Sequence, residues 1–197
     1  RRGDIHILLI GDPGVAKSVL LQYTSHVAPK SVIASGTSAT GAGLTAAAVR
    51  DDFGDGQWTL EAGALVLADM GIACIDELDK MQETDRNKLH TSMEQQEIPI
   101  NKAGINTILP TRTSVLASAN PHLGSFDDVT EIYEQVDLPA TIISRFDLVF
   151  ILRDRIDREK DAATAKHILS IDTDEGSLEP IFSPEFIRKF VAYAKEH

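Results

Sequence analysis

The stretch GDPGVAKS at residues 11–18 decides the fold, because it joins an apolar segment to a helix-forming one. The preceding run IHILLI, at residues 5–10, is short, apolar and rich in β-branched side chains, which is typical of a buried strand. Residues 19–27 then favour a helix. A strand, a small-residue loop and a helix in this order, with a loop close to the pattern G-x-x-x-x-G-K-[ST], predict a phosphate-binding loop.

The residue types in this loop suit the chemistry of phosphate binding. Backbone N–H groups converge on a phosphate only if nearby side chains are small, and the helix N-terminus adds a favourable dipole. We expect Lys17 to reach the β- and γ-phosphates of a nucleotide and the Ser18 hydroxyl to bind Mg²⁺. One residue departs from the pattern, because Ala16 stands where the pattern has Gly. The alternative is an ordinary strand-to-helix turn with a surface lysine. The predicted nucleotide-binding residues are Gly11, Asp12, Pro13, Gly14, Val15, Ala16, Lys17 and Ser18.

Two adjacent acids close a second predicted strand. The small and apolar run IACI at residues 72–75 is followed directly by Asp76 and Glu77. Beside a phosphate-binding loop, the aspartate is expected to hold Mg²⁺ through water, and the glutamate to polarise the attacking water as a general base. The alternative is a pair of solvated acids that favours the start of the following helix. Cys74, in the middle of the strand, is predicted to be a buried, inert thiol.

Further strands and helices alternate along the chain. Strands are predicted at residues 32–34, 113–118 and 148–152, and a β-hairpin at residues 98–109. The alternation predicts an α/β fold with a five-stranded, mainly parallel sheet. We expect residues 1–152 to form this core.

The last part of the chain, residues 153–197, is expected to begin a helical subdomain that is incomplete here. Ser183 and Pro184 predict a helix start. Phe186, Phe190 and Ala194 follow at a spacing of four and predict one apolar face.

Two polar residues flank the later strands. Asn120 follows the predicted strand at residues 113–118, at the sheet edge where open α/β folds bind ligands, and it could orient the lytic water. It could equally be a turn residue before Pro121. Arg145 lies just before the last strand, where it could serve the γ-phosphate of a neighbouring subunit or pair with Asp147 at the surface.

Composition and charge narrow the function classes. The net charge of −11 argues against a protein that binds nucleic acid through bulk charge. Residues 101–120, however, hold Lys102 and Arg112 and no acid, which makes this stretch a candidate basic element. A single cysteine, the lack of a leader and the lack of an apolar run of 18 residues predict an intracellular protein with no membrane partner. The chain opens with Arg1 rather than Met, and we expect it to be part of a longer protein.

Four motifs in this order resemble those of the AAA+ ATPases and, more narrowly, of the minichromosome maintenance (MCM) replicative helicases. GDPGVAKS carries that family's Ala-for-Gly variant of the Walker A loop, and IDELDKM is similar to its Walker B element. ASANP resembles its sensor 1 segment, and LPATIISRFDLVF its arginine-finger block. Residues 44–69 resemble an insertion of the family, and Lys102 matches a lysine that a second hairpin projects into a central pore.

The resemblance implies an ATP hydrolase and DNA helicase subunit of a ring of six MCM subunits, identical or different, for DNA replication. ATP and Mg²⁺ would be the cofactors, and single- or double-stranded DNA in the pore the partner. Lys17, Ser18, Asp76, Glu77 and Asn120 would act within one subunit and Arg145 on the next. Ser125, Phe126 and Asp127 replace the family's usual Arg-Tyr-Asp, so an intersubunit arginine contact is expected to be absent.

Two other functions stay open from the residues alone. One is another AAA+ motor that remodels proteins, of the magnesium-chelatase or transcription-activator type. The other is a nucleotide-binding scaffold with little hydrolysis. Lys102 on an acid-free hairpin favours DNA over the first, and Glu77 together with Arg145 argues against the second. The location would be the cytoplasm or nucleoid in an archaeon and the nucleus in a eukaryote.

Overall fold

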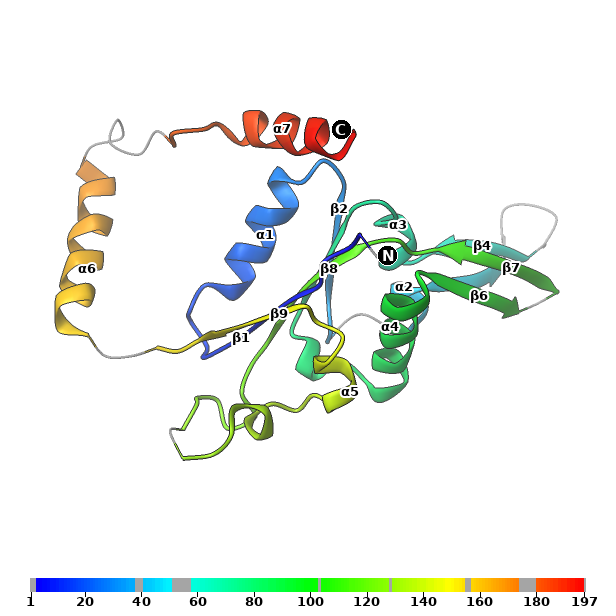
Figure 1. Cartoon of the computed structure of the whole chain (residues 1–197), viewed down its shortest axis with the longest axis horizontal. Coiled ribbons are helices and arrows are strands. Elements are labelled where there is room, and N and C mark those ends of the chain that lie inside the picture. The colour runs from blue at the N-terminus through cyan, green and yellow to red at the C-terminus, as the bar shows by residue number, and fades with distance from the viewer. Residues whose placement is uncertain are drawn as a thin grey trace.

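A five-stranded sheet forms the centre of the chain (Figure 1). The computed structural model describes residues 3–37, 41–50, 58–102, 104–127, 129–154, 157–173 and 180–196. Every neighbouring pair of strands in the sheet runs parallel, in the order β2-β5-β8-β1-β9. The strands are β1 (Ile7–Gly11), β2 (Ser31–Ser35), β5 (Ile72–Asp76), β8 (Ser114–Ala119) and β9 (Leu148–Leu152). The predicted α/β fold with a parallel sheet is confirmed.

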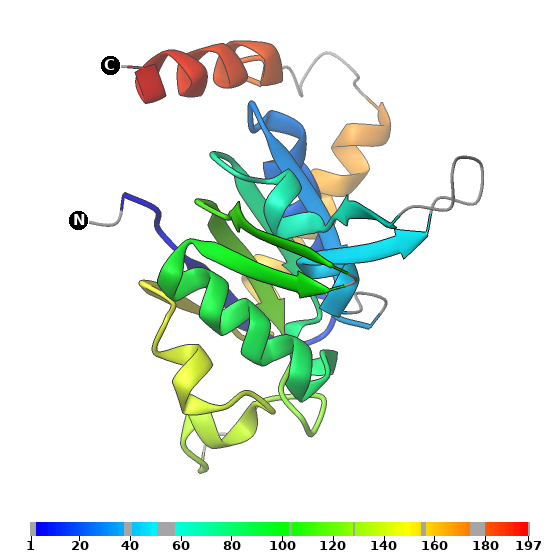
Figure 2. The same ribbon diagram turned by 90° about the vertical axis from the view of Figure 1, so that its right-hand side faces the viewer.

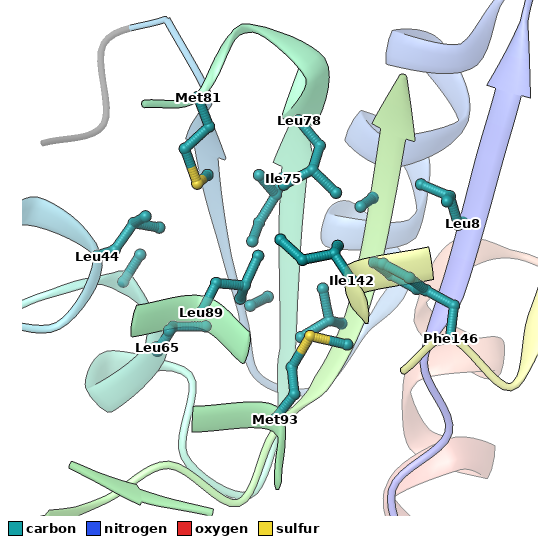
Figure 3. Close-up of a cluster of buried hydrophobic side chains, with 14 of the residues drawn as sticks. Leu8, Leu44, Leu65, Ile75, Leu78, Met81, Leu89, Met93, Ile142 and Phe146 are labelled. Carbon is teal, nitrogen blue, oxygen red and sulfur yellow. The ribbon is translucent and has the colours of Figure 1, made fainter. Parts of the chain in front are cut away.

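The two faces of the sheet bury unequal cores. Alternate residues of a strand point to opposite faces, and Leu8 and Ile10 lie in the larger cluster while Leu9 lies in a small cluster with Leu21 and Cys74. The larger cluster gathers side chains from many helices over one face (Figure 3). The sheet is therefore anchored mainly from that side.

The helices divide between these two faces. α1 (Lys17–Val27) packs on β5 and β8 on the side of the small cluster. The larger cluster takes side chains from α2 (Gly41–Leu44), α3 (Ala64–Leu67), α4 (Glu83–Gln95) and α5 (Ala140–Ile143). Short 3-10 helices span Leu78–Lys80 and Ile132–Gln135. After β9 come α6 (Arg158–Thr173) and α7 (Pro184–Glu196), and α7 contacts the C-terminal end of α1.

Two antiparallel hairpins project together from one side of the sheet (Figures 1 and 2). One pairs β3 (Ala46–Arg50) with β4 (Trp58–Ala62), and the other pairs β6 (Glu97–Lys102) with β7 (Ile105–Pro110). A groove lined by Ala46 of the first hairpin and residues 98–101 of the second lies where the two hairpins meet. The hairpin predicted at residues 98–109 and the insertion expected at residues 44–69 are thus both present as hairpins, although residues 51–57 of the insertion lie outside the described residues.

The helix expected after Glu77 is interrupted. A 3-10 turn ends at Lys80, and α4 begins only at Glu83. The side chain of Arg86 reaches back across this break, with Nε 2.7 Å from the carbonyl oxygen of Met81 and Nη2 2.9 Å from that of Asp79. The guanidinium thus donates hydrogen bonds to carbonyl oxygens that backbone N–H groups would bind in a continuous helix. Met81 consequently lies outside α4, yet its side chain is buried in the same cluster as the helix.

The predicted start of α7 is confirmed, but its expected apolar face is exposed. The backbone N–H of Phe186 donates to Oγ of Ser183 at 3.2 Å, which is an N-cap hydrogen bond. Phe186 and Phe190 are 52% and 61% exposed and stack on each other with ring centroids 6.3 Å apart.

None of the helices in the described ranges is both long and apolar enough to cross a bilayer. The division at residue 152 stays a prediction, although β9 ends there.

Replacing Leu89 tests the dominance of the larger cluster. Leu89 is fully buried under the sheet in α4, so Leu89→Ala should lower the free energy of unfolding by about 3 kcal/mol through lost burial and a residual cavity. Urea unfolding followed by circular dichroism measures this loss. Leu123→Ala, at a side chain that is 71% exposed, is the matched control and should cost less than about 0.5 kcal/mol. Equal effects of the two changes would contradict this description of the core.

Candidate active site at the carboxyl edge of the sheet

The parallel alignment brings the predicted site residues to one edge of the sheet. Gly11 ends β1 and Asp76 ends β5, while Asn120 follows the last residue of β8. In the register of the sheet, Ile10 pairs with Ala119, so Asn120 follows at the level of Gly11. The carboxyl ends of parallel strands are where open α/β sheets bind ligands. The loop after β1 and the acids after β5 therefore share one site.

The loop at residues 11–18 has the backbone that a phosphate-binding loop needs. Gly14 and Ala16 both adopt positive φ, at 86° and 60°. At Ala16 this left-handed conformation costs about 1 kcal/mol relative to glycine, which explains why the general pattern has Gly there. Lys17 and Ser18 form the first turn of α1, directly after the loop. The strand–loop–helix predicted from the sequence is thus present.

Lys17 is buried within this loop. Its Nζ donates hydrogen bonds to the carbonyl oxygens of Gly11 and Asp12, at 2.7 Å each. The residue is only 6% exposed. Burial lowers the pKa of the Lys17 ammonium, and the nearby carboxylates of Asp12, Asp76 and Asp79 oppose that shift. The loop therefore holds a cation whose charge depends on its acidic neighbours.

The Asp76 carboxylate is oriented by the neighbouring strand. The hydroxyl of Ser118 on β8 donates to Oδ1 of Asp76. The same Oγ accepts the backbone N–H of Glu77 at 3.0 Å. Sequence reasoning missed Ser118, because the strand pairing that brings it to Asp76 joins residues 42 positions apart.

Glu77 is fixed in an unusual backbone conformation. Its φ of 55° is left-handed, which is uncommon for a residue other than Gly, Asn or Asp. The Thr37 hydroxyl donates to Oε2 of Glu77 at 3.4 Å. Gly36 packs so closely that a Cβ there would lie 2.1 Å from the carbonyl oxygen of Glu77. The end of β2 thus determines where the glutamate lies, and neither Gly36 nor Thr37 was singled out from the sequence.

A buried carboxylate positions the segment that carries Asn120. Asp79 is only 4% exposed, and its Oδ1 accepts the backbone N–H of Asn120 at 3.0 Å. This bond links the 3-10 turn after Glu77 to the end of β8. The sequence pattern gave no indication of this role for Asp79.

Arg145 lies at the opposite edge of the sheet from this site. β9 runs parallel to β1, with Leu148 level with Ile7, so Arg145 precedes the amino ends of both strands. The 5 residues of β1 separate the two edges by about 15 Å, at about 3.3 Å per residue. Arg145 donates from Nε to Nε2 of His90 at 3.0 Å and pairs with Glu94 at 3.0 Å. The structure therefore does not bring Arg145 to the phosphate loop of its own chain.

The candidate basic element divides into two parts. Lys102 pairs through its backbone with Ile105 at the end of the β6–β7 hairpin, and Gly104 in the turn adopts a positive φ of 80°. Its side chain lies outside what the structure describes. Arg112 forms a bidentate pair with Asp69, with distances of 3.1 and 2.8 Å, and this pair lowers the pKa of the Asp69 carboxyl. Arg112 is thus neutralised locally, whereas Lys102 is placed near a hairpin tip as expected.

The structure also places Cys74 and the segment after Asn120. Cys74 is fully buried, and burial raises the pKa of its thiol to about 11, which confirms an inert thiol. Phe126 and Asp127 lie in the loop after β8, and the Arg153 guanidinium lies 5.3 Å from the centre of the Phe126 ring. Oδ1 of Asp127 accepts the backbone N–H groups of Val129 and Thr130 within that loop.

A buried lysine in a strand–loop–helix, beside an acidic strand end, defines the class of P-loop ATPases. Residues 1–172 match the family described as the MCM P-loop domain, and the chain belongs to this family. Membership in a P-loop ATPase family implies ATP binding. The resemblance drawn from the four motifs is therefore confirmed.

The relatives cover the whole chain. It is 50% identical over 196 residues to the minichromosome maintenance protein MCM of Saccharolobus solfataricus, covering 100% of the chain and 28% of the relative. It is 48% identical over 200 residues to the DNA replication licensing factor mcm7 of Schizosaccharomyces pombe, covering 100% of the chain and 26% of the relative. It is 46% identical over 200 residues to the DNA replication licensing factor mcm4 of the same yeast, covering 100% of the chain and 22% of the relative. The chain thus spans about a quarter of the length of these relatives.

The pKa of Lys17 makes nucleotide affinity depend on pH. Only the ammonium form attracts phosphate, and burial favours the neutral form. Affinity for ATP should thus be highest below the lowered pKa and fall as the pH rises through it, by up to about tenfold per pH unit. Calorimetric titrations from neutral pH to above 10.5, the ordinary pKa of lysine, measure this dependence. An affinity that stays constant over the whole range would contradict the role of Lys17.

Proposed function

We propose that this chain is the ATP-hydrolysing motor domain of a hexameric MCM ring that moves along DNA and unwinds it during replication. The observation that carries the proposal is the division of the site between two edges. The phosphate loop, Asp76, Glu77 and Asn120 share one edge, while Arg145 lies at the other. A subunit supplies its arginine only to a neighbour, which a closed ring of identical interfaces allows for every copy.

Each residue at the carboxyl edge then has a role that its surroundings support. The loop backbone and the Lys17 ammonium bind the phosphates, and the hydrogen bonds of Lys17 to two carbonyls indicate the place of an incoming acceptor. Ser18 and Asp76 hold Mg²⁺, Asp76 through water. Bound Mg²⁺ neutralises charge that develops on the phosphates. Glu77 takes the proton of the attacking water, and Asn120 orients that water.

The residues present fit this nucleotide and ion. Asp76 is already oriented by the Ser118 hydroxyl, and Ser18 lies in the first turn of the helix that follows the loop. Across the described ranges no group of three or more His, Cys, Asp or Glu side chains is arranged to hold a metal ion. A Mg²⁺ ion here would therefore need ligands from phosphate and water, as Mg²⁺ sites in nucleotide-binding enzymes commonly do.

DNA is the proposed partner in the pore, and Lys102 its contact. The β6–β7 hairpin places this residue beside its turn, in an acid-free stretch. The names of the relatives, which include replication licensing factors, support a role in replication and an intracellular location. Residues 153–197 would begin the helical lid of the motor. The alternative, a motor that remodels proteins, is distinguished by the response to DNA.

Mixed rings test the shared site. Arg145→Ala and Lys17→Ala should each reduce hydrolysis, the former by about a thousandfold or more in an assembled ring. Mixing the two variants creates some interfaces with an intact phosphate loop facing an intact arginine. The mixture should therefore turn over ATP faster than the sum of its parts, which a phosphate-release assay on the full-length protein measures.

Two controls accompany the mixed rings. Glu77→Gln should bind ATP. When this variant is mixed with Arg145→Ala, no interface that uses the phosphate loop of a Glu77→Gln subunit should hydrolyse ATP. Arg112→Ala removes an arginine that is already paired with Asp69, and it should leave hydrolysis without DNA unchanged. If mixtures of Lys17→Ala and Arg145→Ala never exceed the sum of their parts, the arginine does not act across subunits.

Replacing Lys102 tests the DNA contact. A lysine that contacts phosphate releases a counterion, so Lys102→Ala should flatten the log–log slope of DNA affinity against salt by about 0.7 to 0.9. Unwinding by the full-length ring should fail while basal hydrolysis persists. Lys30→Ala is the matched control, since its ammonium donates to the Asp69 carbonyl oxygen away from the hairpin. Wild-type unwinding by Lys102→Ala would favour the protein-remodelling alternative.

A further inference from the structure

Asp12 joins three segments that are distant in the sequence. Its carboxylate is buried, with the residue 7% exposed. Oδ1 accepts the backbone N–H of Phe126 at 2.9 Å, in the loop after β8, and Oδ2 accepts the backbone N–H of Asp154 at 2.8 Å, just after β9. The side chain of a phosphate-loop residue thus points away from the loop and holds two neighbouring connections.

The backbone of Asp12 adds contacts to β9 and to Lys17. Its N–H donates to the carbonyl oxygen of Leu152 at 3.0 Å, which extends the pairing of β1 with β9. Its own carbonyl oxygen accepts Nζ of Lys17 at 2.7 Å. The phosphate-binding lysine and the exit from β9 therefore contact the same residue.

A second contact joins the two connections held by the carboxylate. The guanidinium of Arg153, one residue before Asp154, lies 5.3 Å from the centre of the Phe126 ring, within the range of a cation–π interaction. The loop after β8 and the start of the segment after β9 thus meet each other as well as Asp12.

Only a carboxylate satisfies this arrangement. Both of its oxygens accept a hydrogen bond from a backbone N–H group. A carboxamide of the same shape offers one accepting oxygen, and its NH₂ group would face the second N–H group without a bond. A buried N–H group left in this way is unfavourable. The two connections therefore require a carboxylate at position 12.

We propose that Asp12 is a positioning residue that makes the loop after β8 and the exit from β9 respond to phosphate binding at residues 11–18. This inference rests on the proposed nucleotide binding. Lys17 has three N–H donors, and the carbonyl oxygens of Gly11 and Asp12 use two of them, so the third can bind a phosphate while the bond to Asp12 persists. A bound phosphate therefore restrains Lys17 together with Asp12, whose side chain holds Phe126 and Asp154, so both connections are tightened together with the loop.

Hydrogen–deuterium exchange resolved to single amides tests the proposal, with ADP as the probe. In the wild-type chain, ADP should slow exchange of the Phe126 and Asp154 amides by about tenfold. Asp12→Ala, compared at an ADP concentration that saturates it by calorimetry whatever its affinity, should lose this protection at both amides. Asp12→Asn keeps the shape of the side chain and should lose it at one amide or both, which provides the test if the alanine variant does not fold.

Asp127→Asn is the matched control. Its carboxylate also accepts two backbone N–H groups, but both belong to its own loop, so the protection of Asp154 by ADP should persist. Unchanged protection at both amides in a folded, ADP-binding Asp12 variant would overturn the inference and leave the proposed function intact. Failure of the wild-type chain to bind ADP would instead overturn the proposed function, and the inference with it.

Discussion

The parallel direction of all five strands is the constraint on which the rest of the molecule depends. It places the ends of β1, β5 and β8 at one edge, so that a lysine, two acids and an amide that are far apart in the sequence meet there. The same constraint sends Arg145, which precedes β9, to the other edge. Under the proposed function, a site that needs both groups is therefore incomplete in one copy of the chain, and the topology requires a second subunit to supply the arginine.

Within the site, the charged groups are held by donors from neighbouring strands and turns. Burial of a carboxylate without hydrogen-bond donors is strongly unfavourable. Asp76 receives the Ser118 hydroxyl, Asp79 receives a backbone N–H, and Asp12 receives two. The three carboxylates lie near Lys17, where their negative charge opposes the loss of its proton. The phosphate loop thus has its cation and its acidic neighbours in fixed positions before a ligand arrives.

The sequence predicted the parts of this arrangement that depend on local pattern. The loop at residues 11–18, the acids at the end of β5, the hairpin at residues 98–109 and the N-cap at Ser183 all follow from neighbouring residues, and the structure has each of them. It did not predict Ser118, Thr37 or Asp79, because their contacts depend on strand order and register. No spacing along the chain encodes that Ser118 pairs in space with a residue 42 positions earlier.

One expectation was wrong, and one confirmed feature lies where the sequence did not predict it. A helix was expected to follow Glu77 directly, yet the chain breaks between Lys80 and Glu83, and Arg86 bonds carbonyls on the N-terminal side of the break. The phenylalanines of α7 share one face as predicted, but that face is exposed. Periodicity reports which side chains share a face of a helix. It does not report whether another element covers that face.

The position of α4 connects the two ends of the proposed mechanism. Arg145 is bound to His90 and Glu94 on this helix, which ends at Gln95, and β6 of the Lys102 hairpin begins at Glu97. Helices are stiff over their length, and the buried side chains of α4 pack into the larger cluster. A neighbouring nucleotide that draws Arg145 away from Glu94 must therefore break contacts to the same helix that carries the hairpin. The arginine and the hairpin cannot change their positions independently as long as those contacts persist.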